Sequence, residues 1–147
     1  MNPGKISVLL VEDDNVDYMN VKRAFKKNEL TYPLYRAENG LDALDMLRGN
    51  RQSEFSKPPN IILLDINMPQ MNGIEFLKEL RLDPQLKNTV VIILTTSNDE
   101  KDLFDAYNLA VQGYILKPVT FDAFQKAIAT LNDYWILCET PDLIYGR

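Results

Sequence analysis

The chain has 147 residues, of which 46% are hydrophobic and 25% charged, and its formal net charge is −5. This composition is typical of one soluble globular domain, and the acidic balance argues against nonspecific binding to DNA or to membrane surfaces. The chain contains no histidine, which excludes histidine-based acid–base catalysis, histidine-based nucleophilic triads and most catalytic zinc sites. With a single cysteine and no apolar leader or span, we expect a cytoplasmic protein.

Five segments of the chain have the character of strands, and a helix-like segment follows each of them. In chain order, the expected strands are residues 6–11, 32–37, 61–64, 90–94 and 113–116. The expected helices begin at Asp14 or Asn15, at Asn39-Gly40, after Asn72-Gly73, at Ser97 through an S-x-x-E capping box, and at Thr120. Residues 48–59 are polar and read as a surface loop.

The last helix is expected to be unusually long. Its apolar positions step by three and four without interruption: Phe121, Phe124, Ile128, Leu131, Trp135 and Cys138. This spacing predicts a helix that continues to about residue 137. Strands that alternate with helices predict an α/β fold with a doubly wound, five-stranded parallel sheet in three α/β/α layers. The short strands suit the flavodoxin-like order 2-1-3-4-5.

Asp65 follows the apolar run Ile61–Leu64, which has the pattern of a central strand buried on both faces. The first, fourth and fifth expected strands end in Glu12-Asp13, in Thr95 and in Lys117. Because the carboxyl ends of parallel strands share one edge of the sheet, these side chains should meet in one cleft. Carboxylates held together need a cation, and Mg²⁺ prefers such oxygen ligands. A carboxylate nucleophile beside Mg²⁺, a hydroxyl and an ammonium suits phosphoryl transfer onto aspartate.

Each signal has a bland reading when it is considered alone. Asp65 and Thr95 are ordinary residues at a strand end, and the capping box already explains Ser97. Lys117 followed by Pro118 restricts the backbone more than a surface lysine requires, and the sequence leaves the peptide before Pro118 open between cis and trans. The order and spacing of the whole set favour the functional reading.

The sequence resembles the receiver domain of two-component response regulators over roughly residues 5–132. The matching motifs, in order, are Val8–Asp14, Leu63–Pro69, Met71-Asn72-Gly73, Ile93–Thr96 and Tyr114–Pro118. By this resemblance, Asp65 is the phosphoacceptor, and Asp13, Asp65 and the Asn67 carbonyl bind Mg²⁺, with Glu12 acting through water. Thr95 and Lys117 would bind the phosphate, and Tyr114 would be the aromatic switch residue. Asn67 and Ser97 would tune dephosphorylation.

The resemblance also implies partners. Single-domain regulators paired with bacterial phytochrome-type histidine kinases look similar in the 51–59 loop, the Leu94–Ser97 run and the Tyr134-Trp135 tail. We therefore expect one receiver domain over residues 1–147, with a helical extension and tail from about 133, and a histidine kinase as partner. We expect no DNA-binding domain, because only roughly fifteen residues follow the match. A surface formed by the helix that starts near residue 98, the 113–116 strand and the last helix, including its Trp135 tail, is expected to bind a partner or a second copy.

Two alternatives remain at the sequence level. A haloacid-dehalogenase-like phosphatase also uses a nucleophilic aspartate with Mg²⁺, but it needs a second acid two residues later, where this chain has Asn67. A phosphorylation-independent pseudo-receiver scaffold would not need the complete set of Asp65, Thr95 and Lys117.

Overall fold

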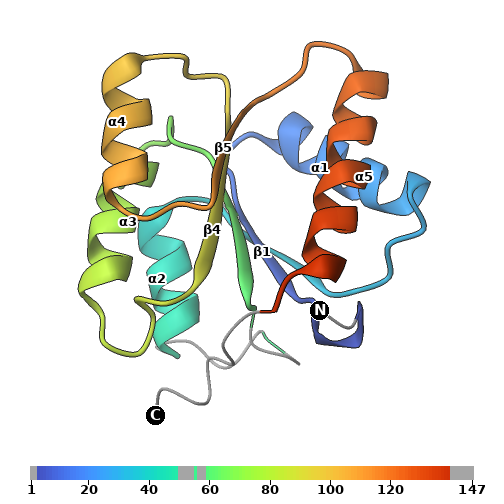
Figure 1. Cartoon of the computed structure of the whole chain (residues 1–147). Coiled ribbons are helices and arrows are strands. Elements are labelled where there is room, and N and C mark those ends of the chain that lie inside the picture. The colour runs from blue at the N-terminus through green and yellow to red at the C-terminus, as the bar shows by residue number, and fades with distance from the viewer. Residues whose placement is uncertain (1–2, 50–54, 56–58, 140–147) are drawn as a thin grey trace.

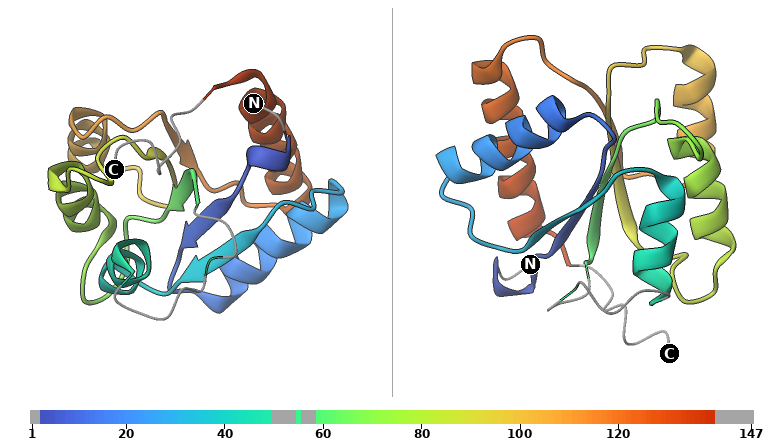
Figure 2. Two further views of the ribbon diagram at one scale, coloured as in Figure 1. Left: turned by 90° about the horizontal axis from the view of Figure 1, so that it is seen from below. Right: turned by 180° about the vertical axis from the view of Figure 1, so that it is seen from behind.

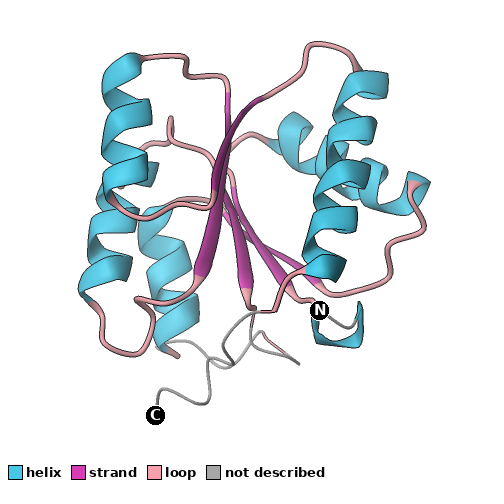
Figure 3. Cartoon of the chain, viewed as in Figure 1, coloured by secondary structure: helices cyan, strands magenta, loops and turns pink. Residues whose placement is uncertain are grey.

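The computed structural model describes residues 3–49, 55 and 59–139 of the chain. They form one sheet of strands flanked by helices (Figure 3). All strand pairs are parallel, and the strand order is β2-β1-β3-β4-β5, as the sequence predicts. The strands are β1 (Val8–Val11), β2 (Leu34–Ala37), β3 (Ile61–Leu64), β4 (Val90–Thr95) and β5 (Gly113–Leu116). The helices are α1 (Asn15–Lys27), α2 (Gly40–Arg48), α3 (Gly73–Leu82), α4 (Glu100–Asn108) and α5 (Phe121–Leu137), after a short 3₁₀ turn at Pro3–Lys5.

The helices cover both faces of the sheet. Helices α1 and α5 lie on one face, and α2, α3 and α4 lie on the other (Figures 1 and 2). Alternate residues of each inner strand enter opposite cores: Leu9 and Ile62 pack with α2–α4, whereas Leu10 and Leu63 pack with α1 and α5. Because both faces are buried, the inner strands carry no polar alternation. None of the helices in the described part of the chain is long and apolar enough to cross a membrane.

Polar side chains fix the start of each long helix. Asp14, Asn39 and Thr120 cap α1, α2 and α5, each by accepting a hydrogen bond from a backbone N–H of the first turn. Asn72 forms a reciprocal capping box with Glu75 at the start of α3. These four starts agree with the sequence prediction, although the box at α3 was not expected.

The predicted capping box at Ser97 is wrong. Helix α4 begins two residues later, because the Asp99 carboxylate accepts from the Lys101 N–H and acts as the cap. The Ser97 hydroxyl instead donates to the Asp102 carboxylate at 2.7 Å. Ser97 thus belongs to the loop that leads from β4 to α4.

Helix α5 extends to Leu137, as its spacing predicts, but its last turns belong to the core. Trp135 is 1% exposed, and its ring lies edge-on to Tyr32 with centroids 6.3 Å apart. The expectation that Trp135 contributes to an exposed partner surface is therefore wrong; its exposed neighbours are Tyr134, Ile136 and Leu137.

Two further expectations concern the loops. The polar loop at 48–59 falls mostly outside the described residues. No peptide bond of the described chain is cis, so the bond before Pro118 is trans.

Candidate phosphoacceptor and metal site

The parallel ladder continues for one residue beyond several strands and so aligns the candidate site residues. The Glu12 N–H donates to the Ala37 carbonyl at 2.9 Å, and the Asp65 N–H donates to the Val11 carbonyl at 3.0 Å. On the other side of the site, the Lys117 N–H donates to the Thr95 carbonyl at 2.8 Å. The backbone therefore holds the residues that follow β1, β3 and β5 at one edge of the sheet.

Three carboxylates meet at this edge. Glu12, Asp13 and Asp65 each offer one oxygen, and these oxygens all lie within 4.8 Å of one another. Glu12 and Asp65 are buried, and Asp13 is exposed. Like charges at this spacing repel, and hard oxygen donors suit a hard divalent cation, so the set fits Mg²⁺ or a related ion.

Asp65 is held by contacts on two sides. The Thr95 hydroxyl, which is fully buried, donates to Oδ1 of Asp65 at 2.6 Å. On the other side, α3 begins against the backbone of Asp65: a Cβ at Gly73 would lie 2.4 Å from the Asp65 carbonyl oxygen and 2.8 Å from the Cα of Ile66. Residue 73 must therefore lack a side chain for the loop after Asp65 to close onto α3.

Lys117 brings one ammonium into the cluster, and its side chain is 9% exposed. Its Nζ lies 2.5 Å from Glu12 Oε1, 2.7 Å from Asp17 Oδ2 and 3.5 Å from Asp65 Oδ2. Glu12, Asp17 and Asp65 share this ammonium, and Asp13 adds a fourth carboxylate to the site. The excess of negative charge is a second reason why the site suits a divalent cation.

Burial and charge shift the ionisation of this cluster. Burial raises the pKa of Glu12 to about 8; the Asp65 charge adds to the rise, and the Lys117 ammonium opposes it. Burial alone would lower the pKa of Lys117, but its hydrogen bonds to Asp17 and Glu12 outweigh that effect and raise the pKa above its ordinary value. Lys117 therefore stays charged at neutral pH and can serve as a cationic contact.

The expected switch and tuning residues surround the cluster. Tyr114 is half-buried on β5, and burial raises the pKa of its hydroxyl. That hydroxyl donates to the Ser97 carbonyl at 2.8 Å, and the Ser97 N–H donates to Thr95 Oγ1 at 3.2 Å. Asn67 lies exposed in the loop after β3, two residues beyond Asp65.

Sequence reasoning missed two residues at the site. Asp17, in the first turn of α1, binds Lys117 as described above. Arg36 on β2 donates to the carbonyl oxygens of Glu12 and Asp13, both at 3.1 Å, and its guanidinium lies over the Tyr18 ring at 4.6 Å. Asp17 lies one helical turn after the acidic end of the first strand, so its spacing indicates that it could face the site. Arg36 has no comparable signal in the sequence.

Comparison with known proteins identifies the class to which this fold and site belong. Residues 8–129 match the model of the response regulator receiver domain, and the chain belongs to that family of two-component signalling proteins. This confirms the resemblance over most of its expected extent.

The most similar relatives narrow the class. The chain is 35% identical over 135 residues to the response regulator Rcp1 of Synechocystis, covering 92% of this chain and 91% of the relative. Among solved structures, the phosphorylated cyanobacterial phytochrome response regulator RcpA superposes with a TM-score of 0.85 at 29% identity, covering 93% of this chain and 99% of that one. The Mn²⁺-bound form of Rcp1 gives a TM-score of 0.83 at 33% identity, with coverage of 92% and 99%. These relatives are response regulators, and one of them, RcpA, is a phytochrome response regulator.

Proposed function

We propose that this protein is a stand-alone response regulator that accepts a phosphoryl group on Asp65, with Mg²⁺ bound by Asp13, Asp65 and the Asn67 carbonyl and by Glu12 through water. The observation that carries the proposal is the setting of Asp65. Its carboxylate has a hydroxyl donor on one oxygen, an ammonium near the other and two further acids beside it. RcpA, a relative, is described in a phosphorylated form, and Rcp1 in a Mn²⁺-bound form.

The chemistry follows from these groups. An Asp65 oxygen forms a bond to phosphorus while the phosphorus–nitrogen bond to the kinase's phosphohistidine breaks, and the freed imidazole takes a proton from solvent. Lys117 and the Thr95 hydroxyl contact the phosphoryl oxygens and offset their charge. Mg²⁺, when bound, would supply the remaining positive charge at these oxygens.

The phosphoryl donor in this proposal is a histidine kinase, and a phytochrome-type kinase is the particular candidate because the relative RcpA is a phytochrome response regulator. Since the chain has no histidine, any phosphohistidine detected in a transfer mixture belongs to the kinase. The phosphohistidine signal therefore reports on the kinase alone.

Phosphorylation with acetyl phosphate and Mg²⁺ tests the phosphoacceptor directly. Intact-mass measurement should show the wild type gaining one phosphoryl group, and Asp65→Asn should gain none. Asp14→Asn is the matched control, because it removes a nearby charge and asparagine caps a helix as well as aspartate does. Persistent labelling of Asp65→Asn would place the nucleophile elsewhere. Multiple-turnover phosphatase activity would favour the dehalogenase-like alternative, and a wild type without any label would favour a pseudo-receiver scaffold.

The output surface in this proposal is the exposed side of α4, β5 and α5. The edge strand β5 lies between the two helices (Figure 1). Its exposed apolar residues are Leu103, Phe104, Tyr107, Leu116, Tyr134, Ile136 and Leu137. We infer that phosphorylation alters this surface and that a second copy binds it, since symmetric dimers are the commonest soluble assemblies.

Sedimentation velocity with and without beryllofluoride, a phosphate mimic, tests the output surface. Phe104→Asp, at a position 68% exposed on α4, should prevent the change in association that the mimic causes in the wild type. Leu82→Asp, at a position 78% exposed on α3, is the matched control and should behave like the wild type. If both variants respond like the wild type, the output surface lies elsewhere. A point variant is preferable to truncation at Leu131, because truncation would remove the buried Trp135.

A further inference from the structure

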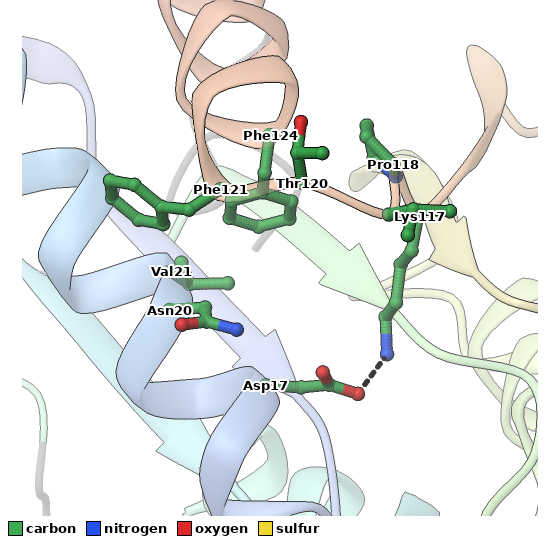
Figure 4. Close-up of a pocket in the computed structure, with 9 residues that line it drawn as sticks. Asp17, Asn20, Val21, Lys117, Pro118, Thr120, Phe121 and Phe124 are labelled. Atoms are coloured by element: carbon green, nitrogen blue, oxygen red, sulfur yellow. Dashed lines mark hydrogen bonds and ion pairs between the residues drawn. The ribbon is translucent and has the colours of Figure 1, made fainter.

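Asp17, which was not among the predicted site residues, binds the ammonium of Lys117 from α1. Figure 4 shows the Lys117 side chain reaching towards Asp17 on α1, and the two charged groups are 2.7 Å apart. The same ammonium is 3.5 Å from the nearer oxygen of Asp65. Lys117 is therefore closer to the α1 carboxylate than to the proposed phosphoacceptor.

The hydrogen-bonding capacity of Lys117 is already filled in this arrangement. An ammonium has three N–H donors, and three carboxylates, from Glu12, Asp17 and Asp65, lie within reach of it. A phosphoryl group on Asp65 needs at least one of these donors. Asp17 does not belong to the acidic cluster formed by Glu12, Asp13 and Asp65. A bound metal would draw Glu12 and Asp65 towards itself, whereas Asp17 would keep its contact with Lys117.

The surroundings of Asp17 favour a role towards Lys117 rather than towards a separate ligand. Asp17, Asn20, Lys117 and Phe124 help to line a small pocket beside the cleft (Figure 4). The volume of that pocket is about 50 Å³, which is room for a few water molecules. The Asp17 side chain is about one-third exposed, and the Lys117 side chain is almost fully buried.

We propose that Asp17 is a positioning residue that draws Lys117 towards α1 and competes with the phosphoryl group for its ammonium. This inference rests on the proposed function of Asp65. In the free protein, Asp17 keeps part of the positive charge away from Asp65. When a phosphoryl group is present, the ammonium must divide its donors between that group and Asp17. The residue at position 17 therefore sets how strongly the site holds the phosphoryl group.

Asp17→Asn separates charge from hydrogen bonding. The amide oxygen can still accept from Lys117, but the negative charge that competes for the ammonium is gone. At saturating Mg²⁺, beryllofluoride should bind Asp17→Asn roughly three- to tenfold more tightly than the wild type, as expected for removal of one unit charge a few ångströms away. Isothermal titration calorimetry measures this affinity. Asp14→Asn removes a charge from the same helix start without touching Lys117, and its affinity should stay within about twofold of the wild type.

A second measurement does not depend on phosphate chemistry. The buried, hydrogen-bonded Lys117 ammonium should give a slowly exchanging ¹⁵N–¹H signal in the free protein, and Lys117→Arg assigns it by its loss. Asp17→Asn should shift this signal or speed its exchange with water, and Asp14→Asn should leave it unchanged. A structural role for Asp17 in α1 alone would leave the signal in place.

The two measurements separate the possible failures. An unchanged Lys117 signal in Asp17→Asn overturns the inference, as does beryllofluoride binding that matches Asp14→Asn or is weaker than the wild type. A wild type that binds no beryllofluoride in Mg²⁺ overturns the proposed phosphoacceptor site, and the competition with it. In that case a shifted Lys117 signal would establish only that Asp17 orients the lysine.

Discussion

The hydroxyl of Tyr114 donates a 2.8 Å hydrogen bond to the backbone carbonyl of Ser97, and so joins β5 to the loop between β4 and α4. The Ser97 N–H donates in turn to the hydroxyl of Thr95, and that hydroxyl donates to Asp65. A short chain of contacts thus connects the proposed phosphoacceptor with the edge strand. Contiguity alone does not demonstrate coupling, so its contacts must be broken one at a time.

Tyr114→Phe removes the contact with Ser97 and keeps the ring. We expect a loss of about 1 kcal/mol in the free energy of unfolding, typical of one hydrogen bond, and faster amide hydrogen exchange in the β4–α4 loop. Tyr107→Phe is the matched control, because Tyr107 is 52% exposed on α4. Urea unfolding and hydrogen-exchange mass spectrometry make the comparison. Equal exchange in the loop of both variants would show that the Tyr114 hydroxyl does not hold it.

Gly73→Ala should disturb the phosphoacceptor loop. The added Cβ would meet the Asp65 carbonyl oxygen at 2.4 Å, a contact with backbone that cannot move without shifting the loop. We expect a destabilisation of about 1–3 kcal/mol, as for overpacking in a core, and slower labelling by acetyl phosphate. Gly113→Ala is the control, since its Cβ would lie 3.8 Å from an Ile92 methyl group, an ordinary contact. If the two alanine variants unfold at the same urea concentration, α3 has room to move away from Asp65.

Arg36→Lys should weaken metal binding. Arg36 binds the carbonyl oxygens of Glu12 and Asp13 and the Asn15 side chain through three different nitrogens, a geometry that lysine cannot reproduce. Because the charge is kept, the substitution tests positioning and leaves the electrostatic repulsion of the cation unchanged. We expect Mg²⁺ affinity to fall roughly tenfold. This is the lower end of the range for substitutions of residues that hold metal ligands in place.

Calorimetric titration of Mg²⁺ provides that comparison. The control is Arg48→Lys, because Arg48 pairs with Glu79 and Asp83 at the far ends of α2 and α3. Unchanged Mg²⁺ affinity in Arg36→Lys would mean that the acidic loop keeps its shape without the guanidinium.

The sequence predicted the sheet because its signals are local and repeated. Each inner strand is a continuous apolar run, and each run stops at a polar residue, so strand order and strand ends followed from the pattern. The predicted start of α4 was wrong for a local reason. Ser97 and Asp99 can both cap a helix, and the contact of Ser97 with Asp102 decides between them. The prediction that Trp135 contributes to an exposed surface was wrong because helical spacing assigns a residue to the apolar face of a helix but does not show what packs against that face. Tyr32, about a hundred residues away, is one of its contacts.

The candidate site divides in the same way. The residues that end strands were predictable, and the structure brings Glu12, Asp13, Asp65, Thr95 and Lys117 together. Asp17 and Arg36 were not predicted. Asp17 lies on a helix and Arg36 on an edge strand, and each contacts the site through its side chain. Their contacts depend on rotamers and packing, which a single sequence does not display.

Glu12 should make stability depend on pH. Its pKa lies near 8 in the folded protein, chiefly because of burial, against an ordinary value of 4.5. Between these values the folded state binds more protons than the unfolded chain. The stability contributed by this group is therefore fully present below about pH 4.5 and is lost as the pH rises through 8.

Urea unfolding with a chelator at pH 6 and at pH 8.5, about half a unit above the Glu12 pKa, tests this linkage. The wild type should lose more stability between the two conditions than Glu12→Gln, which cannot ionise at position 12 yet keeps a polar group beside Lys117. Glu38→Gln, at an exposed position, should behave like the wild type. Added Mg²⁺ should reduce the loss in the wild type, because the ion binds the deprotonated carboxylates of the folded state. If the wild type and Glu12→Gln change by the same amount without metal, another group is responsible for the pH dependence, and Glu12 is already ionised at pH 6.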